Sequence, residues 1–580
     1  MILSVNSGIG SSVGLFNNGK LIVCLQEERF TRIKNYMGFP QKSLDFILNT
    51  YVKPEEIKHI ALCNSADHQI TTESFYKRYD DAFEDAVDGK TFDRYTLQNA
   101  LSKAPVFNSI YKALKRNKHL LKNRMDVKKL LELGFSIDIM RTVGHHDCHA
   151  GAVYYGLAQD QNEPYLVFTA DGGGDDITTA VWKGENGDLS PLATSNCYSL
   201  GNMYSMVTHF LGFKAHEHEY KLMGLAPYVN PKYAQKYAEF FEKFLGLIDD
   251  DTVFFNYERM EHRTFAKALL DQFKNDRFDN IAAGLQLFSE RISIRWIKGC
   301  IKKYGISKIL GSGGTFMNVK INKLIAELPE VTFVDVFPSC GDESNIFGAY
   351  YITDRKVSSN TSVSRLTHYT TGSLPSPDLA SALMTFKDKI SFEVVDDVNK
   401  VMAEYLAEHK LIARCTGPME FGARALGNRS ILANPSDLKN VSTINRAVKK
   451  RDFWMPFAPI VLDSRKDDYL NIPESIKTHG SPYMMFATDT KEDKRDDMIC
   501  AIHQGDFTAR PEIIDSKRYC DLYEILSHFN DKTGIGVLLN TSYNLHGYPI
   551  VENSHQAIEV FVQTELDFLV IDSTVIRKRP

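Results

Sequence analysis

The chain has 580 residues, more than one hydrophobic core usually organises, so two large domains are expected. Apolar residues make up 43% of the chain and aromatic residues 11%, a composition that is typical of globular proteins and excludes a largely disordered or fibrous chain. The net charge of −5 excludes a protein that binds nucleic acid through an overall basic surface, although local basic patches stay open.

The N-terminus and the cysteines predict a cytoplasmic protein. Residues 1–6 have no basic region before an apolar run, and no stretch approaches the roughly 20 apolar residues that span a bilayer. The nine cysteines include no C-x-x-C pair, so neither a disulfide scaffold nor a thiolate zinc site is indicated. We therefore expect no membrane partner. The oligomeric state is not readable from the sequence.

The chain opens on a predicted antiparallel meander. Three apolar segments, 2–6, 13–16 and 21–25, are separated by a small-residue loop and an Asn-Asn-Gly-Lys turn. Further strands are expected at 60–63, 165–170 and 178–182, with helical periodicity between and after them.

A basic stretch lies between the strand predicted at 60–63 and the strand predicted at 165–170. Residues 103–129 carry nine Lys or Arg and one acid, Asp126, with apolar residues at near-helical spacing. One interpretation is a solvated helical hairpin, and the other is a cationic surface for a polyanionic acceptor.

Two histidines indicate a metal site. His145 and His149 are four residues apart, so on a helix both imidazoles project from one face, about 6 Å apart at Cβ. Carboxylates that could complete the site are Asp171 or Asp175 after an apolar strand and Asp342 at an expected strand-to-helix turn, where it could also be a helix cap. Imidazole with carboxylate suits Fe(II), Mn or Zn.

Two glycine loops are typical of phosphate binding. Residues 171–175 place three consecutive glycines between two acids, which suits either converging N–H groups or a flexible hairpin tip. Residues 311–314 follow the strand 308–310 and precede an expected helix, but they lack the spacing of G-x-G-x-x-G and the Lys of a P-loop. Each loop alone is a weak signal.

A composition break at residues 356–377 is the best domain boundary, because Ser, Thr, Gly and Pro replace the periodic pattern there. Beyond it a helix is expected at 397–409 and a strand at 411–415. A strong apolar run at 535–539 ends in Asn540-Thr541-Ser542.

The second part of the chain contains a predicted anion site. Arg424 and Arg429 lie five apart amid glycines, a pattern that favours a loop presenting guanidinium groups to phosphate. Lys449, Arg451 and Arg510 add three cations. Any one of these could serve only as a surface charge, but the five together predict a phosphate-binding function.

These motifs resemble, over nearly the whole chain, the O-carbamoyltransferases that act on nodulation factors and on antibiotics such as tobramycin and novobiocin. The residues that carry the resemblance are Glu27-Glu28-Arg29-Phe30 with Lys34, His145-His146-x-x-His149-Ala150, Asp171-Gly172-Gly173-Gly174-Asp175, Glu219-x-Lys221-x-Met223-Gly224-Leu225-Ala226, Gly313-Gly314 with Asn318, Gly341-Asp342, Glu420-Phe421-Gly422-x-Arg424-Ala425-Leu426-Gly427-Asn428-Arg429-Ser430, Lys449-x-Arg451, Pro456-Phe457-Ala458-Pro459, Thr508-Ala509-Arg510 and Asn540-Thr541-Ser542-x-Asn544.

The resemblance implies an α/β fold in two parts. Residues 1–355 would form an actin-like ATPase domain, related to threonylcarbamoyl transferases, with a basic helical insertion near 75–135. Residues 356–377 would be a linker, and residues 378–580 a YrdC-like α/β domain. The second domain would make carbamoyl adenylate from ATP, with Mg, and carbamoyl phosphate. The first would then transfer the carbamoyl group to an acceptor hydroxyl.

The resemblance also implies roles by position. His145, His149 and Asp342 would ligate a divalent metal, iron in the first place and zinc or manganese otherwise. The substrate and nucleotide contacts would be Gly313, Gly314, Asn318, Arg424, Arg429, Lys449, Arg451, Arg510, Asn540 and Ser542. The catalytic candidates are Asp171, Lys221 and His146, the last as the base that takes the alcohol proton.

The acceptor is left open. It could be a small sugar or natural product, or a hydroxymethylated base in DNA. The chain departs from the family where His-Asp is usual, at Ile9 and Gly10, and where Arg is usual, at Met455. Two other classes are an actin-like ATPase or sugar kinase, which does not explain the arginines of the second part, and a non-catalytic binding protein.

Overall fold

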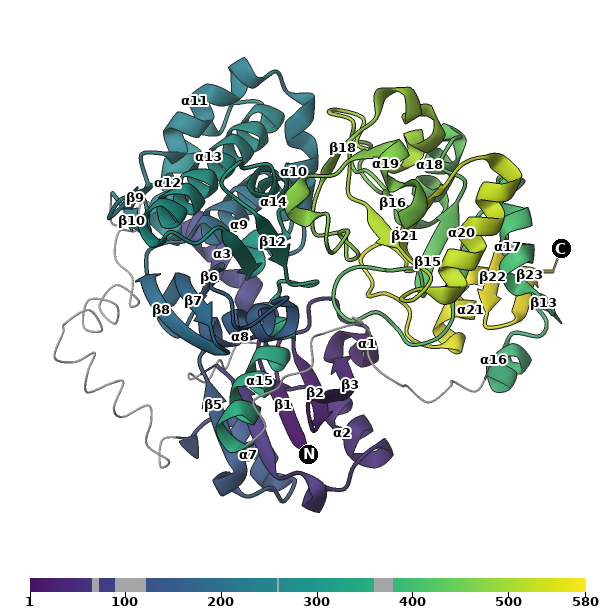
Figure 1. Cartoon of the computed structure of the whole chain (residues 1–580), viewed down its shortest axis with the longest axis horizontal. Helices are drawn as coiled ribbons and strands as arrows, with labels where there is room; N and C mark the ends of the chain where they lie inside the picture. The colour runs from purple at the N-terminus through teal and green to yellow at the C-terminus, as the bar shows by residue number, and fades with distance from the viewer. Residues whose placement is uncertain (65–71, 89–120, 258–259, 359–378, 580) are drawn as a thin grey trace.

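The computed structural model describes residues 1–64, 72–88, 121–257, 260–358 and 379–579. The first part of the chain, meaning the described residues up to 358 (purple to teal in Figure 1), builds two five-stranded sheets. The last part, residues 379–579, builds a separate eight-stranded sheet. The predicted α/β class is confirmed. Among the described residues, every helix falls short of the length or the hydropathy that crossing a membrane requires.

The first sheet has the order β3-β2-β1-β4-β5. As predicted, β1 (Ile2–Asn6), β2 (Ser12–Asn17) and β3 (Lys20–Gln26) form an antiparallel meander. β4 (His59–Cys63) and β5 (Met140–Val143) extend the sheet in parallel on the other side of β1. Side chains of β4 alternate between two hydrophobic cores, because successive strand residues point to opposite faces.

The second sheet repeats this plan in the order β12-β11-β6-β7-β8. β6 (Tyr165–Gly174), β7 (Ile177–Glu185) and β8 (Asp188–Ser195) are an antiparallel meander, and β11 (Lys308–Ser312) and β12 (Phe333–Val336) add parallel strands beside β6. The first part of the chain therefore contains the same topology twice, which is the arrangement of the actin-like ATPase fold.

Two helices lie between these sheets (Figure 1): α8 (His145–Leu157) and α15 (Asn345–Val357). They approach so closely that a Cβ at Gly348 would lie 1.7 Å from the carbonyl oxygen of Cys148. Glycine is required for this contact. The contact holds the start of α8 near the turn that precedes α15.

The other elements of the first part cover the sheets or line the cavity described below. The helices are α1 (Glu27–Thr31), α2 (Gln41–Thr50), α3 (Thr72–Val87), α7 (Met125–Glu132), α9 (Leu200–Phe210), α10 (Glu219–Leu225), α11 (Pro231–Phe241), α12 (His262–Phe273), α13 (Phe278–Tyr304) and α14 (Val319–Ala326). A small antiparallel pair consists of β9 (Leu245–Ile248) and β10 (Val253–Asn256).

The last part of the chain is organised around one mixed sheet in the order β13-β23-β22-β14-β15-β21-β16-β20. These strands are β13 (Ile390–Val394), β14 (Ile412–Cys415), β15 (Arg429–Ala433), β16 (Ala458–Leu462), β20 (Glu512–Ile514), β21 (Val537–Ser542), β22 (Phe568–Ile571) and β23 (Thr574–Lys578).

Helices and a small sheet surround this mixed sheet. The helices are α16 (Leu379–Thr385), α17 (Val398–Ala407), α18 (Leu438–Ile444), α19 (Lys466–Tyr469), α20 (Cys520–Thr533) and α21 (Ser554–Val562). A three-stranded sheet consists of β17 (Leu470–Asn471), β18 (Thr488–Thr490) and β19 (Thr508–Ala509). Neighbouring residues of β15 enter different cores, Ile431 with α21 and Leu432 with α17 and α20.

Two sequence predictions fall largely outside the described residues. Residues 359–378 contain most of the predicted linker, and α15 already occupies its first two positions, so the domain division stays a prediction. Most of the basic stretch 103–129 is likewise outside. Within its described end, Arg124 and Asp126 form a buried ion pair at 2.6 Å and so contribute no surface charge.

Candidate functional site

A single cavity of about 700 Å³ is lined by both parts of the chain. The first part contributes the loop after β1, the start of α8, the end of β6 and the turn before α15. The last part contributes the loop before β15, the segment before β16 and the end of β19. This volume lies within the range of sites that bind nucleotides and other small molecules.

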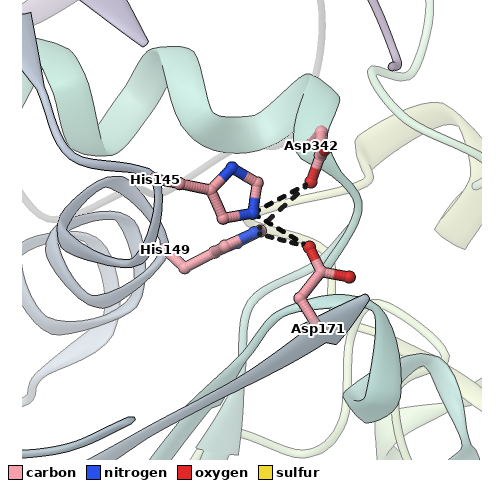
Figure 2. A group of neighbouring side chains, drawn as sticks. All are labelled: His145, His149, Asp171 and Asp342. Carbon is pink, nitrogen blue, oxygen red and sulfur yellow. Dashed lines mark hydrogen bonds and ion pairs between the residues drawn. The ribbon is translucent and has the colours of Figure 1, made fainter. Parts of the chain in front are cut away.

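Two imidazoles and two carboxylates converge at the first-part wall of the cavity (Figure 2). His145 Nε2 lies 3.1 Å from Asp171 Oδ2 and 3.6 Å from Asp342 Oδ1. His149 Nε2 lies 3.3 and 3.5 Å from the same two oxygens. The four ligand atoms all lie within 4.8 Å of one another, which is the arrangement a single metal ion requires.

Hydrogen bonds fix the direction of both imidazoles. His145 Nδ1 lies 2.7 Å from Asn64 Oδ1, and His149 Nδ1 lies 3.3 Å from Ser312 Oγ. Such outer contacts set the tautomer, and here they turn both Nε2 atoms toward the carboxylates. Asn64 follows β4 with a positive φ of 70°. Its carbonyl accepts a 2.7 Å hydrogen bond from the Arg124 guanidinium, which holds it in place.

The electrostatics of this group favour a cation. Burial lowers the pKa of His149, but the carboxylates of Asp171 and Asp342 outweigh burial and raise that pKa to about 9. Burial works against the charged form of Asp171, yet its two histidine partners hold its pKa well below the ordinary value. Positive charge is therefore stabilised between these residues, so they fit a divalent metal in ligand type, spacing and charge.

The opposite wall carries positive charge. Arg424, Arg451 and Arg510 line the cavity, and among the described residues no carboxylate lies within ion-pair distance of any of them. Burial and the charges of Arg424 and Arg451 hold the pKa of Arg510 well below its ordinary value. Three like charges held together without counterions predict an anionic ligand.

Lys449 lies in the same wall and is fixed by oxygen atoms. Its Nζ donates to Ser542 Oγ at 3.1 Å and to Asn544 Oδ1 at 2.7 Å. Burial, Arg451 and Lys34 hold the pKa of Lys449 well below its ordinary value. Ser542 also lines the cavity.

Comparisons with known proteins identify the family. The model described as Carbamoyltransferase N-terminus matches residues 5–350, and the one described as Carbamoyltransferase C-terminus matches residues 403–578. The chain belongs to the carbamoyltransferase family. The predicted resemblance is therefore confirmed.

Two relatives extend along this carbamoyltransferase. Nodulation protein NolNO of Sinorhizobium fredii is 30% identical, covering 97% of this chain and 78% of its own. The uncharacterized protein MJ1051 of Methanocaldococcus jannaschii is 30% identical over all of both chains. Full-length HypF in a phosphate- and nucleotide-bound form aligns with a TM-score of 0.37 at 11% identity, covering 62% of this chain and 56% of that one, a likeness too distant to support an argument.

Several predicted site residues of the carbamoyltransferase line the cavity: Asp171, Lys221, Gly314, Asn318, Asp342, Arg424, Lys449, Arg451, Arg510 and Ser542. Lys221 Nζ forms a 3.0 Å ion pair with Asp452, which joins the two parts of the chain at the cavity. Asn318 also caps α14, because its Oδ1 accepts from the N–H groups of Lys320 and Ile321.

His146 and Asp175 do not belong to the metal candidate, the group formed by His145, His149, Asp171 and Asp342. His146 Nδ1 is 2.8 Å from Thr169 Oγ1 and its Nε2 is 3.0 Å from the Ile177 carbonyl oxygen, so both ring nitrogens are occupied. Burial holds the pKa of His146 well below its ordinary value. Asp175 accepts a 2.9 Å hydrogen bond from the His145 backbone N–H at the start of α8.

Three other residues that were predicted to contact the substrates, Arg429, Asn540 and Gly313, do not line the cavity but support the segments that do. Arg429 donates to the carbonyl oxygens of Glu552 and Thr416, each at 3.0 Å. Asn540 donates to the Ala425 carbonyl oxygen at 2.9 Å. Gly313 has a φ of 96°, and a Cβ there would lie 2.4 Å from the Ala170 carbonyl oxygen, so glycine is required.

The departures from the family pattern also lie at the cavity, since Ile9, Gly10 and Met455 all line it. Gly10 has a φ of 63°, and a Cβ at this position would meet the backbone nitrogen of Glu343 at 2.8 Å. The backbone of this carbamoyltransferase thus leaves no room for the Asp that the resemblance expects at Gly10.

Sequence reasoning missed Asn64 and Glu420. Glu420 Oε1 accepts from the backbone N–H groups of Leu426 and Asn428 at 2.7 and 2.6 Å, which holds the loop that carries Arg424. Glu420 lies inside the motif that carries the resemblance, so its presence there was the available signal. Asn64 had none beyond its place at the end of a predicted strand.

Proposed function

We propose that this carbamoyltransferase makes carbamoyl adenylate from ATP and carbamoyl phosphate and transfers the carbamoyl group to an acceptor hydroxyl. One observation supports the proposal most strongly. A single cavity is lined both by three arginines that have no carboxylate partner among the described residues and by His145, Asp171 and Asp342 of the metal candidate. The last part would act as the YrdC-like, adenylate-forming unit.

The chemistry requires activation before transfer. A carbamoyl carbon is a weak electrophile, because its nitrogen donates electrons into the carbonyl. Carbamoyl phosphate would lose phosphate to water, and the carbamate oxygen would attack the α-phosphorus of ATP, releasing pyrophosphate. The acceptor hydroxyl would then attack the carbamoyl carbon, with loss of AMP and of the hydroxyl proton.

The arginines suit the first step. ATP, with Mg, and carbamoyl phosphate bring several negative charges into one volume. Arg424, Arg451 and Arg510 are already in place to compensate them, because their guanidinium groups have no carboxylate partner among the described residues. Positioned charges of this kind stabilise the developing charge of a phosphoryl transition state without further reorganisation.

The residues that would hold a metal are His145, His149, Asp171 and Asp342. Their donor set suits iron, with zinc or manganese as alternatives. A bound divalent ion would polarise the carbamoyl carbonyl group, an effect of several kcal/mol. Asp171 and Asp342 both line the cavity, so the transfer step would take place at this wall.

The acceptor we favour is a small hydroxyl compound. A volume of about 700 Å³ that also receives the adenylate has room for a compound of sugar size. A hydroxymethylated base in DNA is the other acceptor, and the two differ in salt dependence. Binding of DNA would weaken steeply as salt rises, because many counterions are released, whereas a small acceptor with at most one anionic group would show a much smaller change.

The cytoplasm is the compartment we propose. No disulfide joins any of the nine cysteines, all of which lie in the described residues, and Cys520 is exposed, as suits a reducing environment.

The test separates the two steps. Pyrophosphate release should require both ATP and carbamoyl phosphate, and mass spectrometry of candidate acceptors should detect a gain of one carbamoyl group. Release of ADP without any need for carbamoyl phosphate would instead show a kinase. Absence of AMP, pyrophosphate and bound metal would show a non-catalytic binding protein.

A further inference from the structure

A second cationic position lies on the first-part side of the cavity. Arg78 of α3 lines the cavity, and among the described residues no carboxylate pairs with it. Its terminal nitrogen donates to Tyr79 Oη at 3.0 Å and to His216 Nε2 at 3.3 Å. Its Nε is buried without a hydrogen-bond partner.

The guanidinium is held in one orientation. It lies 3.9 Å from the ring centre of Phe75 and 5.0 Å from that of Tyr79. The Tyr79 hydroxyl in turn lies 2.5 Å from His216 Nε2. Arg78 is therefore preorganised, and little side-chain entropy remains to be lost when a ligand binds.

The groups that contact Arg78 are neutral. Burial, followed by the charge of Arg78, lowers the pKa of His216 to about 3 and that of His262 to about 3. Burial raises the pKa of Tyr79, so its hydroxyl stays protonated. None of these residues offsets the positive charge.

Nearby carboxylates have other partners, and Glu219, which also lines the cavity, accepts hydrogen bonds from the His216 backbone N–H and from Ser205 Oγ. On the same helix, Asp80 is exposed to solvent and lies 3.3 Å from His209, and Asp85 pairs with Arg263 at 2.5 Å. Beside His216 in the chain, Glu217 pairs with Lys214. A half-buried guanidinium that has no carboxylate partner among the described residues favours an anionic ligand.

We propose that Arg78, with Tyr79 and His216 beside it, binds an anionic group of the acceptor, a phosphate or a carboxylate. This deepens the proposed function and rests on it. His145 and Asp171 line the same cavity, so an acceptor bound by its anionic end at Arg78 would share the volume that the carbamoyl group enters. The alternative is that Arg78 only braces Phe75 and Tyr79.

Selenate, a tetrahedral oxyanion that is located by anomalous scattering, tests the position directly. Crystals of the wild type soaked in selenate should show it at the terminal nitrogens of Arg78. An Arg78→Met crystal should lose that peak and keep selenate at Arg424 and Arg510, which serve as an internal control. Wild-type crystals that show selenate only at Arg424 and Arg510, or at neither position, would overturn the proposal. A selenate peak that persists near residue 78 in the Arg78→Met crystal would also overturn it.

Carbamoylation of glucose, glucuronate and glucose 6-phosphate tests the link to the acceptor and separates carboxylate from phosphate. The wild type should favour one of the anionic sugars over glucose, and Arg78→Met should reduce that preference about 10- to 100-fold. Lys77→Met is the matched control, because Lys77 is an exposed cation on the same helix. It should leave the preference unchanged.

The two failures are distinguishable. Pyrophosphate release without acceptor should be equal in the wild type, Arg78→Met and Lys77→Met proteins, because the adenylate forms at the opposite wall. Loss of this release in the wild type would sink the proposed function. Normal release with equal transfer to neutral and anionic sugars, or with no transfer to any of the three, would overturn the role of Arg78 in acceptor binding.

Discussion

The two walls of the cavity solve opposite electrostatic problems. At the first-part wall, His149 and Asp171 stabilise each other, and Asn64 and Ser312 hold the imidazoles in position. At the opposite wall, Arg424, Arg451 and Arg510 face one another without carboxylate partners among the described residues. The first wall is arranged to attract a cation and the second to attract anions, and the proposed reaction needs both.

The largest effect is expected for His149→Ala, which should lose carbamoyl transfer and keep pyrophosphate release. His149→Ala removes a metal ligand and should reduce carbamoyl transfer roughly 1000-fold, since metal polarisation contributes several kcal/mol. Pyrophosphate release should remain, because the arginines are untouched. His146→Ala tests the residue predicted as the base. Because both of its ring nitrogens are occupied by Thr169 and the Ile177 carbonyl group, we expect this variant to keep its turnover per folded molecule. Equal losses of both steps in His149→Ala would show that the walls do not act separately.

Arg510→Met should have the reverse pattern. Loss of one guanidinium should reduce pyrophosphate release roughly 100-fold, since removing a partner from an enclosed charge contact costs about 2–5 kcal/mol. The melting temperature should rise, because an uncompensated charge is replaced by a side chain of similar volume. Calorimetry and a pyrophosphate assay measure the two. A variant that is both less stable and fully active would contradict the account of this wall.

Asn64→Ala tests how the metal wall is held. Outer contacts to metal-ligating histidines are worth about 10- to 100-fold in metal affinity, and the Asn64 contact to His145 is shorter than that of Ser312 to His149. Titration with Fe(II) or Zn(II) should therefore show a larger loss of affinity in Asn64→Ala than in Ser312→Ala. Unchanged affinity in both would show that the imidazoles need no such support.

The smallest effect concerns pH. The folded protein raises the pKa of His149 to about 9, above the value of about 6.5 in an unfolded chain. Its contribution to the stability of chelator-treated protein is complete below pH 6.5 and is lost as pH rises through 9. Metal affinity should instead rise with pH, because ligation needs the neutral imidazole. Chelator-treated protein that gains stability over this interval would contradict the assignment.

The sequence predicted those features of the site that local spacing determines. His145 and His149 share a helix face wherever that helix lies, so the proximity of their imidazoles could be predicted from the sequence. Arg424 and Arg429 looked equivalent, but β15 begins at Arg429, which turns its guanidinium toward backbone carbonyls instead of the cavity. Five residues of separation in an irregular loop do not specify which one faces a ligand.

Features of the site that depend on contacts between distant segments could not be predicted from the sequence. Asn64 reaches His145 only because β4 and the start of α8 meet at the same sheet edge. Arg78 reaches the cavity because α3 packs beside the segment that carries His216. The repeated sheet topology also escaped detection, because strand order can be shared by segments whose residues differ.

The most direct test is mass spectrometry of the enzyme incubated with ATP and carbamoyl phosphate in the absence of acceptor. We expect carbamoyl adenylate bound to the wild type and to His149→Ala, with release of one pyrophosphate for each adenylate, and roughly 100-fold slower adenylate formation by Arg510→Met. Formation of ADP, or a rate of adenylate formation that does not depend on Arg510, would contradict this expectation.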